Sequence, residues 1–260
     1  MNTKTAQILC KLSTAFYEEN ALSFSESRYR PWPGWKRAIN FIYPDKSQFP
    51  NQISVLDLAC GNMRFESFLK QNLPQTTLNM YAVDNCPDLL PSAASAQFQD
   101  LDIINCLCED RPLNECIEAS MCDLSVSFGF MHHVPGLNFR IELLKALVMH
   151  TKPGGYIMVS LWQFLNNESL KNKALITHQK ALQTYTDLDL DEGDYLLGWK
   201  NIEGTYRYCH SFSETEIDEL VKAVSPQATL LARYRSDGRG DNLNTYLILK
   251  AKNLSTKVST

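Results

Sequence analysis

Val55-Leu-Asp-Leu-Ala-Cys-Gly-Asn-Met-Arg-Phe65 is the stretch that decides the fold of this 260-residue chain. An apolar, β-prone run ends in an acidic residue, a short turn follows, and a helix can begin directly after it. This order predicts a buried parallel strand over 54–58, a turn over 59–63 and a helix over 64–72. Ligands of open α/β sheets bind at the carboxyl ends of such strands. The stretch therefore predicts an α/β fold with a ligand site at the turn, although an ordinary strand-to-helix turn in any α/β protein has the same pattern.

The size and composition of the chain favour one large domain. With 44% hydrophobic residues, the chain can build a single α/β core with at most one insertion. It contains no apolar run near the roughly 20 residues of a membrane span, and its first residues lack the apolar core of a signal peptide. The eight cysteines include no Cys-x-x-Cys pair, which is typical of reduced thiols. We therefore expect a cytoplasmic protein without a membrane partner.

The net charge of −4, with a pI near 5.8, bears on possible partners. A protein that is acidic overall has no general electrostatic attraction to phosphate backbones. Bulk binding of nucleic acid is thus disfavoured. A local basic patch or a basic partner subunit could still provide it.

Six further segments have strand character: 78–83, 96–99, 124–128, 156–162, 230–234 and 245–250. Helical patterns separate the earlier ones, the clearest over 140–150, which proline and glycine stop signals at 152–155 bring to an end. Strands that alternate with helices are typical of βαβ units and a parallel sheet. We expect an α/β fold with a Rossmann-like sheet of seven strands, the last two of which can pair antiparallel.

The chain divides into a main domain with additions. Residues 1–50 are expected to form an N-terminal helical segment that covers the ligand or the sheet edge, and 51–250 the main domain. Within the main domain, 163–205 is polar and acidic and interrupts the alternation of strands and helices, which predicts an insertion after the fifth strand. Residues 206–212 return to strand-like alternation. Residues 251–260 are expected to be a frayed tail.

Two helical patterns in the N-terminal segment, 5–19 and 35–42, flank an unusual connection. It contains Phe24-Ser-Glu-Ser-Arg-Tyr-Arg-Pro-Trp-Pro33, in which two arginines flank a tyrosine and two prolines bracket a tryptophan. A stiff chain with so many binding side chains favours ligand contact. An aromatic anchor that holds the N-terminal helix on the core is the alternative, because tryptophan is usually buried for packing.

Acidic and apolar residues follow the predicted strands where a nucleotide-like cofactor would lie. Asp84 ends the second strand, where a carboxylate can accept hydrogen bonds from both ribose hydroxyls. In the segment 100–104, Asp102 could accept from an adenine amine and Ile103 could cover the ring, and for Asp100 a loop with two solvated acids is the alternative. We also expect Phe128, at the end of the fourth strand, to lie at the cofactor.

Two histidines, His132 and His133, follow the fourth strand closely. One hypothesis is that both histidines face the crevice and contact the substrate. The alternative is that one is buried in the core and the other lies near a helix. No third candidate ligand is evident near them, so we expect no metal at this site.

Four stretches together resemble the class I S-adenosylmethionine (SAM) methyltransferases over nearly the whole chain. In the first, Asp57, Ala59, Gly61 and Met63 occupy the positions of an acidic-x-Gly-x-Gly-x-Gly loop. The other three are residues 24–33, residues 130–133 with Arg140 and 152–155 behind them, and Arg207-Tyr-Cys-His210. Residues 24–33 and 207–210 make the chain similar to the tRNA wobble-uridine methyltransferases, which methylate a carboxymethyl group on uridine 34, and to the methyltransferase domain fused to an AlkB-like oxygenase.

The resemblance implies SAM as the cofactor and tRNA as a partner, with a small activator subunit possible as in eukaryotic relatives. The residues that it places at SAM are Asp57, Ala59, Gly61, Asp84, Asp102, Ile103 and Phe128. Ala59 and Met63 stand where the superfamily has glycines. Ala59 costs little if its φ is negative, whereas Met63 limits how closely the backbone approaches the methionine part of SAM. The insertion carries no motif of the resemblance.

A carboxymethyl acceptor would shape the chemistry. A carboxylate with a pKa of about 4 is already ionised at neutral pH, so no general base is required and catalysis reduces to alignment with the methyl group. Arginine suits this task because its planar guanidinium grips a carboxylate at two points. The expected catalytic residues are Arg30, Arg207 and His132, and the expected substrate-binding residues are Arg28, Tyr29, Trp32, His133, Tyr208 and His210. We expect the 28–33 and 207–210 segments to meet over the crevice.

Two other functions fit parts of the sequence. The acidic pI and the unmatched insertion fit a methyltransferase for a small-molecule carboxyl or hydroxyl group. The two missing glycines fit a SAM-binding subunit without catalytic activity.

Overall fold

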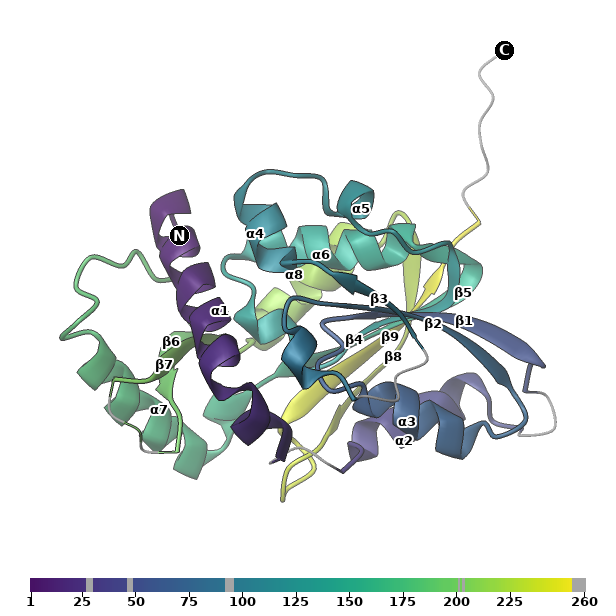
Figure 1. Ribbon diagram of the computed structural model, residues 1–260, viewed down its shortest axis with the longest axis horizontal. Helices are drawn as coiled ribbons and strands as arrows, with labels where there is room; N and C mark the ends of the chain where they lie inside the picture. Colours follow the sequence, from purple (N-terminus) through teal and green to yellow (C-terminus); the bar gives the residue numbers. More distant parts are fainter. Residues whose placement is uncertain (27–29, 46–48, 92–95, 201, 203, 254–260) are drawn as a thin grey trace, which may run out of the picture.

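A computed structural model describes residues 1–26, 30–45, 49–91, 96–200, 202 and 204–253, and its centre is a seven-stranded sheet (Figure 1). In sequence order the strands are β1 (Gln52–Leu58), β2 (Thr77–Asp84), β3 (Gln97–Asp100), β4 (Cys122–Ser127), β5 (Thr151–Trp162), β8 (Ala228–Ser236) and β9 (Asn244–Ala251). Their order across the sheet is β3-β2-β1-β4-β5-β9-β8. The first five are parallel, and β9 is antiparallel to both neighbours. The Rossmann-like, seven-stranded α/β fold predicted from the sequence is confirmed.

Helices cover both faces of the sheet, which explains why its central strands are apolar on both sides. One face carries α2 (Pro33–Ile42) and α3 (Arg64–Asn72), and the other carries α4 (Ile103–Cys108), α5 (Leu113–Cys116), α6 (Leu137–Met149) and α8 (Glu214–Val224) (Figure 1). Along β1, Ile53 and Val55 are buried in the core between the sheet and α2 and α3. Leu56 and Leu58 are buried in the core on the opposite face, which includes residues of α4, α6 and α8. None of the helices in the described part of the chain is long and apolar enough to span a membrane.

The segment after β5 is more ordered than its polar composition suggested. It contains α7 (Glu168–Ala181) and a separate two-stranded antiparallel sheet of β6 (Asp194–Gly198) and β7 (Tyr206–His210). The strand expected over 206–212 is therefore present, but its partner is β6 and not the main sheet. The sequence analysis missed α7 because only two of its residues, Ala174 and Ala181, are buried, which leaves a weak apolar stripe.

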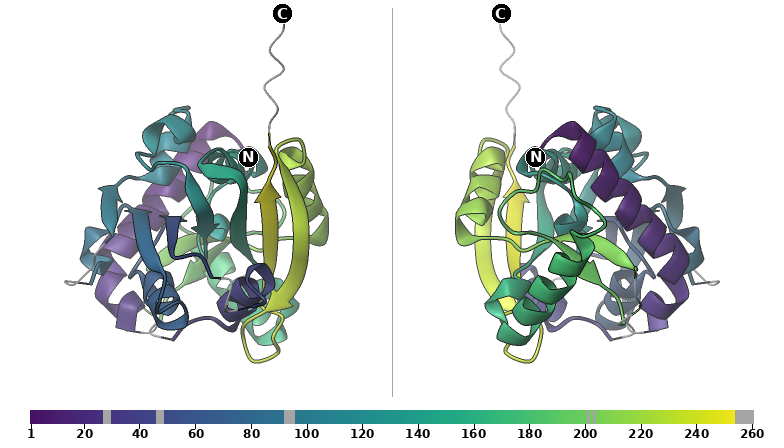
Figure 2. Two further views of the ribbon diagram at one scale, coloured as in Figure 1. Left: turned by 90° about the vertical axis from the view of Figure 1, so that its right-hand side faces the viewer. Right: turned by 90° about the vertical axis from the view of Figure 1, so that its left-hand side faces the viewer.

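Helix α1 (Thr3–Glu26) is longer than the helix expected over 5–19 and lies across one end of the sheet. It packs against β7, α4 and the short 3-10 turn η2 (Pro87–Leu89). Figure 2 shows α1 crossing this end beside α7 and the β6–β7 sheet. The helix and the segment after β5 thus form a wall beyond the carboxyl ends of the parallel strands.

Candidate functional site

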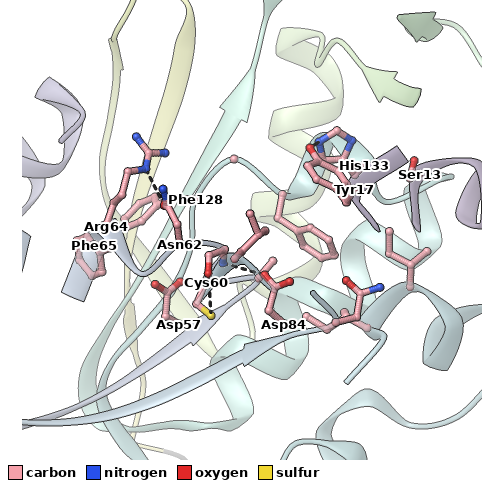
Figure 3. A pocket seen from close by; sticks show the side chains of 18 of the residues that line it. Ser13, Tyr17, Asp57, Cys60, Asn62, Arg64, Phe65, Asp84, Phe128 and His133 are labelled. Carbon is pink, nitrogen blue, oxygen red and sulfur yellow. Dashed lines mark hydrogen bonds between the residues drawn. The ribbon is translucent and has the colours of Figure 1, made fainter. Parts of the chain in front are cut away.

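A pocket lies at the carboxyl ends of the parallel strands, beneath α1 (Figure 3). It encloses about 960 Å³ of empty space when its open mouth is included. Its walls come from the loops after β1, β2, β3 and β4, and from α1. Of the residues that the sequence analysis placed at the cofactor or substrate, the pocket is lined by Trp32, Asp57, Ala59, Gly61, Asp84, Asp102, Ile103, Phe128 and His133.

The loop after β1 repeats one unusual backbone conformation. Ala59, Gly61 and Met63 have φ values of 60°, 53° and 55°, so every second residue is left-handed. The condition under which Ala59 would cost little, a negative φ, is therefore not met. A left-handed L-residue costs about 1–2 kcal/mol relative to glycine. Backbone hydrogen bonds hold the loop in place, because the amides of Ala59 and Cys60 both donate to the Val83 carbonyl, at 2.8 and 3.1 Å.

Two buried carboxylates stand below this loop. Asp84 accepts hydrogen bonds from the amides of Gly61, at 2.8 Å, and Cys86, at 3.0 Å. Burial raises the pKa of Asp84, and the backbone amides that it binds oppose the rise. Burial raises the pKa of Asp57 well above its ordinary range, and the nearby charge of Asp84 adds to this effect. Asp84 therefore joins the loops after β1 and β2 and still has lone pairs for two ribose hydroxyls.

Asp102 and Ile103 form the next part of the wall, after β3. The Oδ1 atom of Asp102 caps α4 by accepting from the Asn105 amide at 2.9 Å, and its Oδ2 atom accepts from the Thr14 hydroxyl of α1 at 3.4 Å. Ile103 is buried beside it. Ile103 and Ile104 begin α4, which the sequence analysis did not predict because this helix is too short to show a periodic pattern.

Aromatic rings and one arginine close the side of the pocket nearest α2 and α3. Phe128 packs at 5.7 Å from Trp35, and Trp32 lies 5.4 Å from Trp35. The guanidinium of Arg64 lies 5.4 Å from both tryptophan rings, and its Nη1 donates to the Arg30 carbonyl at 3.0 Å. The sequence analysis missed Arg64, although its place directly after the glycine-type loop is a usable signal.

The arginines that the sequence analysis favoured lie elsewhere. Arg30 is exposed and is outside the pocket lining, while Arg28 and Tyr29 lie outside the described residues. Arg207 is only 6% exposed. Its guanidinium lies 4.8 Å from the Phe16 ring of α1 and 5.1 Å from the Trp199 ring, and its Nε and Nη1 atoms have no hydrogen-bond partner in the part of the chain that is described.

Arg207 nevertheless lies next to the pocket wall. The carbonyl of the following residue, Tyr208, accepts a hydrogen bond from Nδ1 of the pocket-lining His133 at 2.8 Å. On the other side, Phe16 precedes Tyr17, whose hydroxyl lies 2.7 Å from Nε2 of His133. Strand β7 therefore lies at the same end of the sheet as Trp32, which lines the pocket, although Arg207 itself is outside the lining.

Tyr208 and His210 do not reach the pocket. The Tyr208 hydroxyl donates to Asp194 at 2.7 Å and accepts from Arg140 at 3.2 Å. The two ring nitrogens of His210 bond to Asp194 and Glu216, and Arg140 pairs with Glu216 at 2.8 Å. The prediction that Tyr208 and His210 contact the substrate is therefore wrong. Alternate side chains of β7 point into the protein, and these two belong to a buried ionic network.

His132 is also displaced from its expected place, because it is buried and does not line the pocket. Its ring packs at a tilt against His133, with centroids 4.1 Å apart, and against Trp162, with centroids 4.9 Å apart. Cys209 of β7 joins the two histidines, so the three potential metal ligands lie within 4.8 Å of one another. The assumption that no third ligand is near was wrong. However, Nδ1 of His133 is 2.8 Å from the Tyr208 carbonyl and 3.8 Å from the Cys209 sulfur, which fits a proton shared with the carbonyl better than a lone pair offered to a metal.

A family profile described as a methyltransferase domain matches residues 27–224. The chain belongs to this family. The family and the seven-stranded fold identify a class I SAM-dependent methyltransferase. Among solved structures, a Burkholderia thailandensis N1-methyltransferase with bound S-adenosylhomocysteine superposes with a TM-score of 0.54 at 14% identity, covering 92% of this chain and 89% of that one.

Several relatives in sequence have more specific names. The mouse tRNA (carboxymethyluridine(34)-5-O)-methyltransferase ALKBH8 is 28% identical over 146 residues, which cover 56% of this chain and 19% of the mouse protein. The chain therefore matches about a fifth of that relative. A protein of the same enzyme name from Schizosaccharomyces pombe is 22% identical over 80% of this chain and 85% of its own length. A putative methyltransferase of Encephalitozoon cuniculi is 29% identical over 79% of this chain and 82% of its own length.

Proposed function

We propose that this methyltransferase esterifies the carboxymethyl group of a modified wobble uridine in tRNA. The observation that carries the proposal is the buried guanidinium of Arg207, which lies beside the pocket without a hydrogen-bonded anion among the described residues. A charge removed from water without a partner costs several kcal/mol. An anionic acceptor would supply the missing partner, and relatives named as carboxymethyluridine methyltransferases act on such an acceptor.

The lining of the pocket fits SAM. Asp84 would hold the ribose hydroxyls, and Ile103 would cover the adenine, with Asp102 near its amine. The left-handed loop at Ala59 and Gly61 would lie along the methionine part. When bound, SAM supplies an electrophilic methyl group on a sulfonium centre. Asp57, which is buried and also lines the pocket, would lie near the methionine part as well.

The acceptor needs orientation and no base. Its carboxylate is ionised at neutral pH, so transfer requires only that one oxygen lies in line with the methyl group. Arg207 would bind this carboxylate, and His132 would support His133 through the tilted contact between their rings. Figure 3 shows His133 at the opposite side of the pocket from Arg64 and Asn62. An acceptor that enters on the His133 side would meet a methyl group held between the two sides.

The N-terminal segment would guide the RNA. We assign this role to Arg28, Tyr29 and Arg30, together with Trp32 at the edge of the pocket. In this scheme residues 1–50 form the lid, 51–250 the catalytic domain, 163–205 an inserted wall that contributes Trp199 beside Arg207, and 251–260 a tail. A net charge of −4 requires the basic contacts to be local.

The acidic net charge also favours a second candidate, a small-molecule carboxyl methyltransferase. Parallel assays with a carboxymethyluridine anticodon stem-loop and with the free nucleoside separate the two. The tRNA function predicts a much higher kcat/KM for the stem-loop, whereas equal values would favour the small-molecule function. Mass analysis of tRNA nucleosides from cells with and without the gene is the matching test in vivo: the methyl ester should disappear and the free acid accumulate.

A further inference from the structure

Tyr17 contributes a group to the pocket that the proposed function does not yet use. It lies in the middle of α1, and its hydroxyl is 2.7 Å from Nε2 of His133. Both side chains line the pocket, and Figure 3 shows them together on the side opposite Arg64. Residues far apart in sequence thus form one hydrogen-bonded pair at the acceptor side.

The position of the proton on His133 follows from its other contact. Nδ1 lies 2.8 Å from the Tyr208 carbonyl, which can only accept, so Nδ1 carries a proton. In the neutral imidazole Nε2 then has a lone pair and accepts from the Tyr17 hydroxyl. The phenolic oxygen consequently offers lone pairs, and no proton, to the pocket.

From this geometry we propose that Tyr17 and His133 are a proton-coupled pair that positions an acceptor carboxylate. One proton taken up at Nε2 reverses the hydrogen bond: Nε2–H donates to the Tyr17 oxygen, and the Tyr17 hydroxyl turns to donate to the carboxylate. The proposal rests on the proposed function in one respect, that the acceptor is an anion. It adds Tyr17 as a residue that contacts the acceptor.

The proton balance closes without a base. During transfer the carboxylate oxygen forms a bond to the methyl carbon, the carbon–sulfur bond breaks, and its electron pair remains on sulfur. The product ester is neutral, so no negative charge remains beside the protonated His133. The pair therefore releases its proton when the product leaves. The coupling therefore acts on acceptor binding and not on the chemical step.

The surroundings of His133 agree with this coupling. The sulfur of Cys209 lies 3.8 Å from Nδ1 of His133, and the His132 ring packs at a tilt against the His133 ring. Arg207 directly precedes Tyr208, whose carbonyl accepts from the same Nδ1. The negative charge of a carboxylate that binds beside an imidazole favours the protonated, positively charged form of that ring. Proton uptake is therefore favoured when the acceptor binds.

The test compares the full-length enzyme with its Tyr17→Phe variant, which removes only the hydroxyl. A matched control is Tyr43→Phe, because Tyr43 makes edge-to-face contacts with Phe49 and Tyr156 and is not among the pocket residues. KM and kcat for the carboxymethyluridine stem-loop are measured between pH 5.5 and 8.5, together with the SAM dissociation constant. Because acceptor binding takes up one proton, KM of the wild type should rise with pH by up to about tenfold per pH unit with a nearly constant kcat.

In Tyr17→Phe, KM at low pH should be about tenfold to a hundredfold higher, the effect of a lost hydrogen bond to a charged group. Its pH dependence should be flat, and SAM affinity should match that of the wild type and of Tyr43→Phe. If KM of Tyr17→Phe and its change with pH equal those of the wild type, the proposal of a proton-coupled pair is overturned and the proposed function stands.

If the wild type does not methylate the stem-loop, the proposed function fails. The proposal of a proton-coupled pair is then tested by calorimetry, in which free carboxymethyluridine is titrated into SAM-bound enzyme in two buffers of different ionisation enthalpy. Uptake of close to one proton at pH 7.5, lost in Tyr17→Phe, supports the pair. No proton uptake, or no binding, overturns it.

Discussion

Replacement of Arg207 by methionine should separate stability from activity. The guanidinium lies 4.8 Å and 5.1 Å from two aromatic rings. Each such contact contributes about 0.5–2 kcal/mol, but burying an unpaired charge costs several kcal/mol. Methionine keeps the apolar packing and removes the charge. We therefore expect the free energy of unfolding to rise by about 1–3 kcal/mol, the range in which replacing buried ionic groups stabilises a protein.

The same substitution should impair transfer. If Arg207 makes two charge-assisted hydrogen bonds to the acceptor, at about 1.5–3 kcal/mol each, kcat/KM should fall by at least about 100-fold. The assays are urea denaturation, methyl transfer to the carboxymethyluridine stem-loop and calorimetry with SAM, whose affinity should not change. Arg37→Met is the control, because the Arg37 guanidinium also stacks on an aromatic ring, 4.2 Å from Tyr234, but lies outside the pocket. A destabilised Arg207→Met with wild-type turnover would refute the reasoning and make Arg207 a packing residue only.

Three further substitutions test the cofactor site. Asp84→Ala should weaken SAM binding by about 1.5–3 kcal/mol through the lost ribose hydrogen bonds, and calorimetry that finds unchanged affinity would remove Asp84 from the site. Ala59→Gly should raise the free energy of unfolding by about 0.5–1 kcal/mol, because relief of about 1–2 kcal/mol at its φ of 60° is partly offset by about 0.4–1 kcal/mol of unfolded-state entropy; a lower stability would contradict the assigned strain. Burial raises the pKa of Asp57, so the folded protein keeps a proton that the unfolded chain has lost, and stability should fall as pH rises from about 4 toward the folded-state value. Asp57→Asn should lose this slope and be more stable than the wild type at pH 7.5, and an unchanged slope in denaturant unfolding would refute it.

The parts of the fold that the sequence predicted are those with strong local patterns. The strand before the loop and the helix over Arg64–Asn72 were predicted within two residues of their ends, because a doubly buried strand is continuously apolar and α3 has a clear amphipathic face. Asp84 could be placed in the pocket since the end of a parallel strand always lies at the same edge of the sheet. By contrast, the positive φ of Ala59 could not be read from a residue type that prefers negative values.

The rest of the site depends on tertiary contacts that no local pattern encodes. Tyr17 looked like one aromatic residue of an amphipathic helix, and only the docking of α1 brings it to His133. Tyr208 and His210 share a segment with Arg207, but their acidic partners, Asp194 and Glu216, come from other elements. A sequence motif identifies such a segment as important without showing which of its side chains faces the pocket.

The most direct test of the central claim is the fate of the methyl group on RNA. Purified enzyme is incubated with methyl-labelled SAM and two anticodon stem-loops that differ only in the carboxymethyl group of the wobble uridine. An ester is cleaved by mild alkali, whereas a methyl group on a base or ribose survives it. We predict that label enters only the carboxymethylated RNA and that mild alkali releases all of it. Label that enters both RNAs, that resists alkali, or that enters neither would contradict the account.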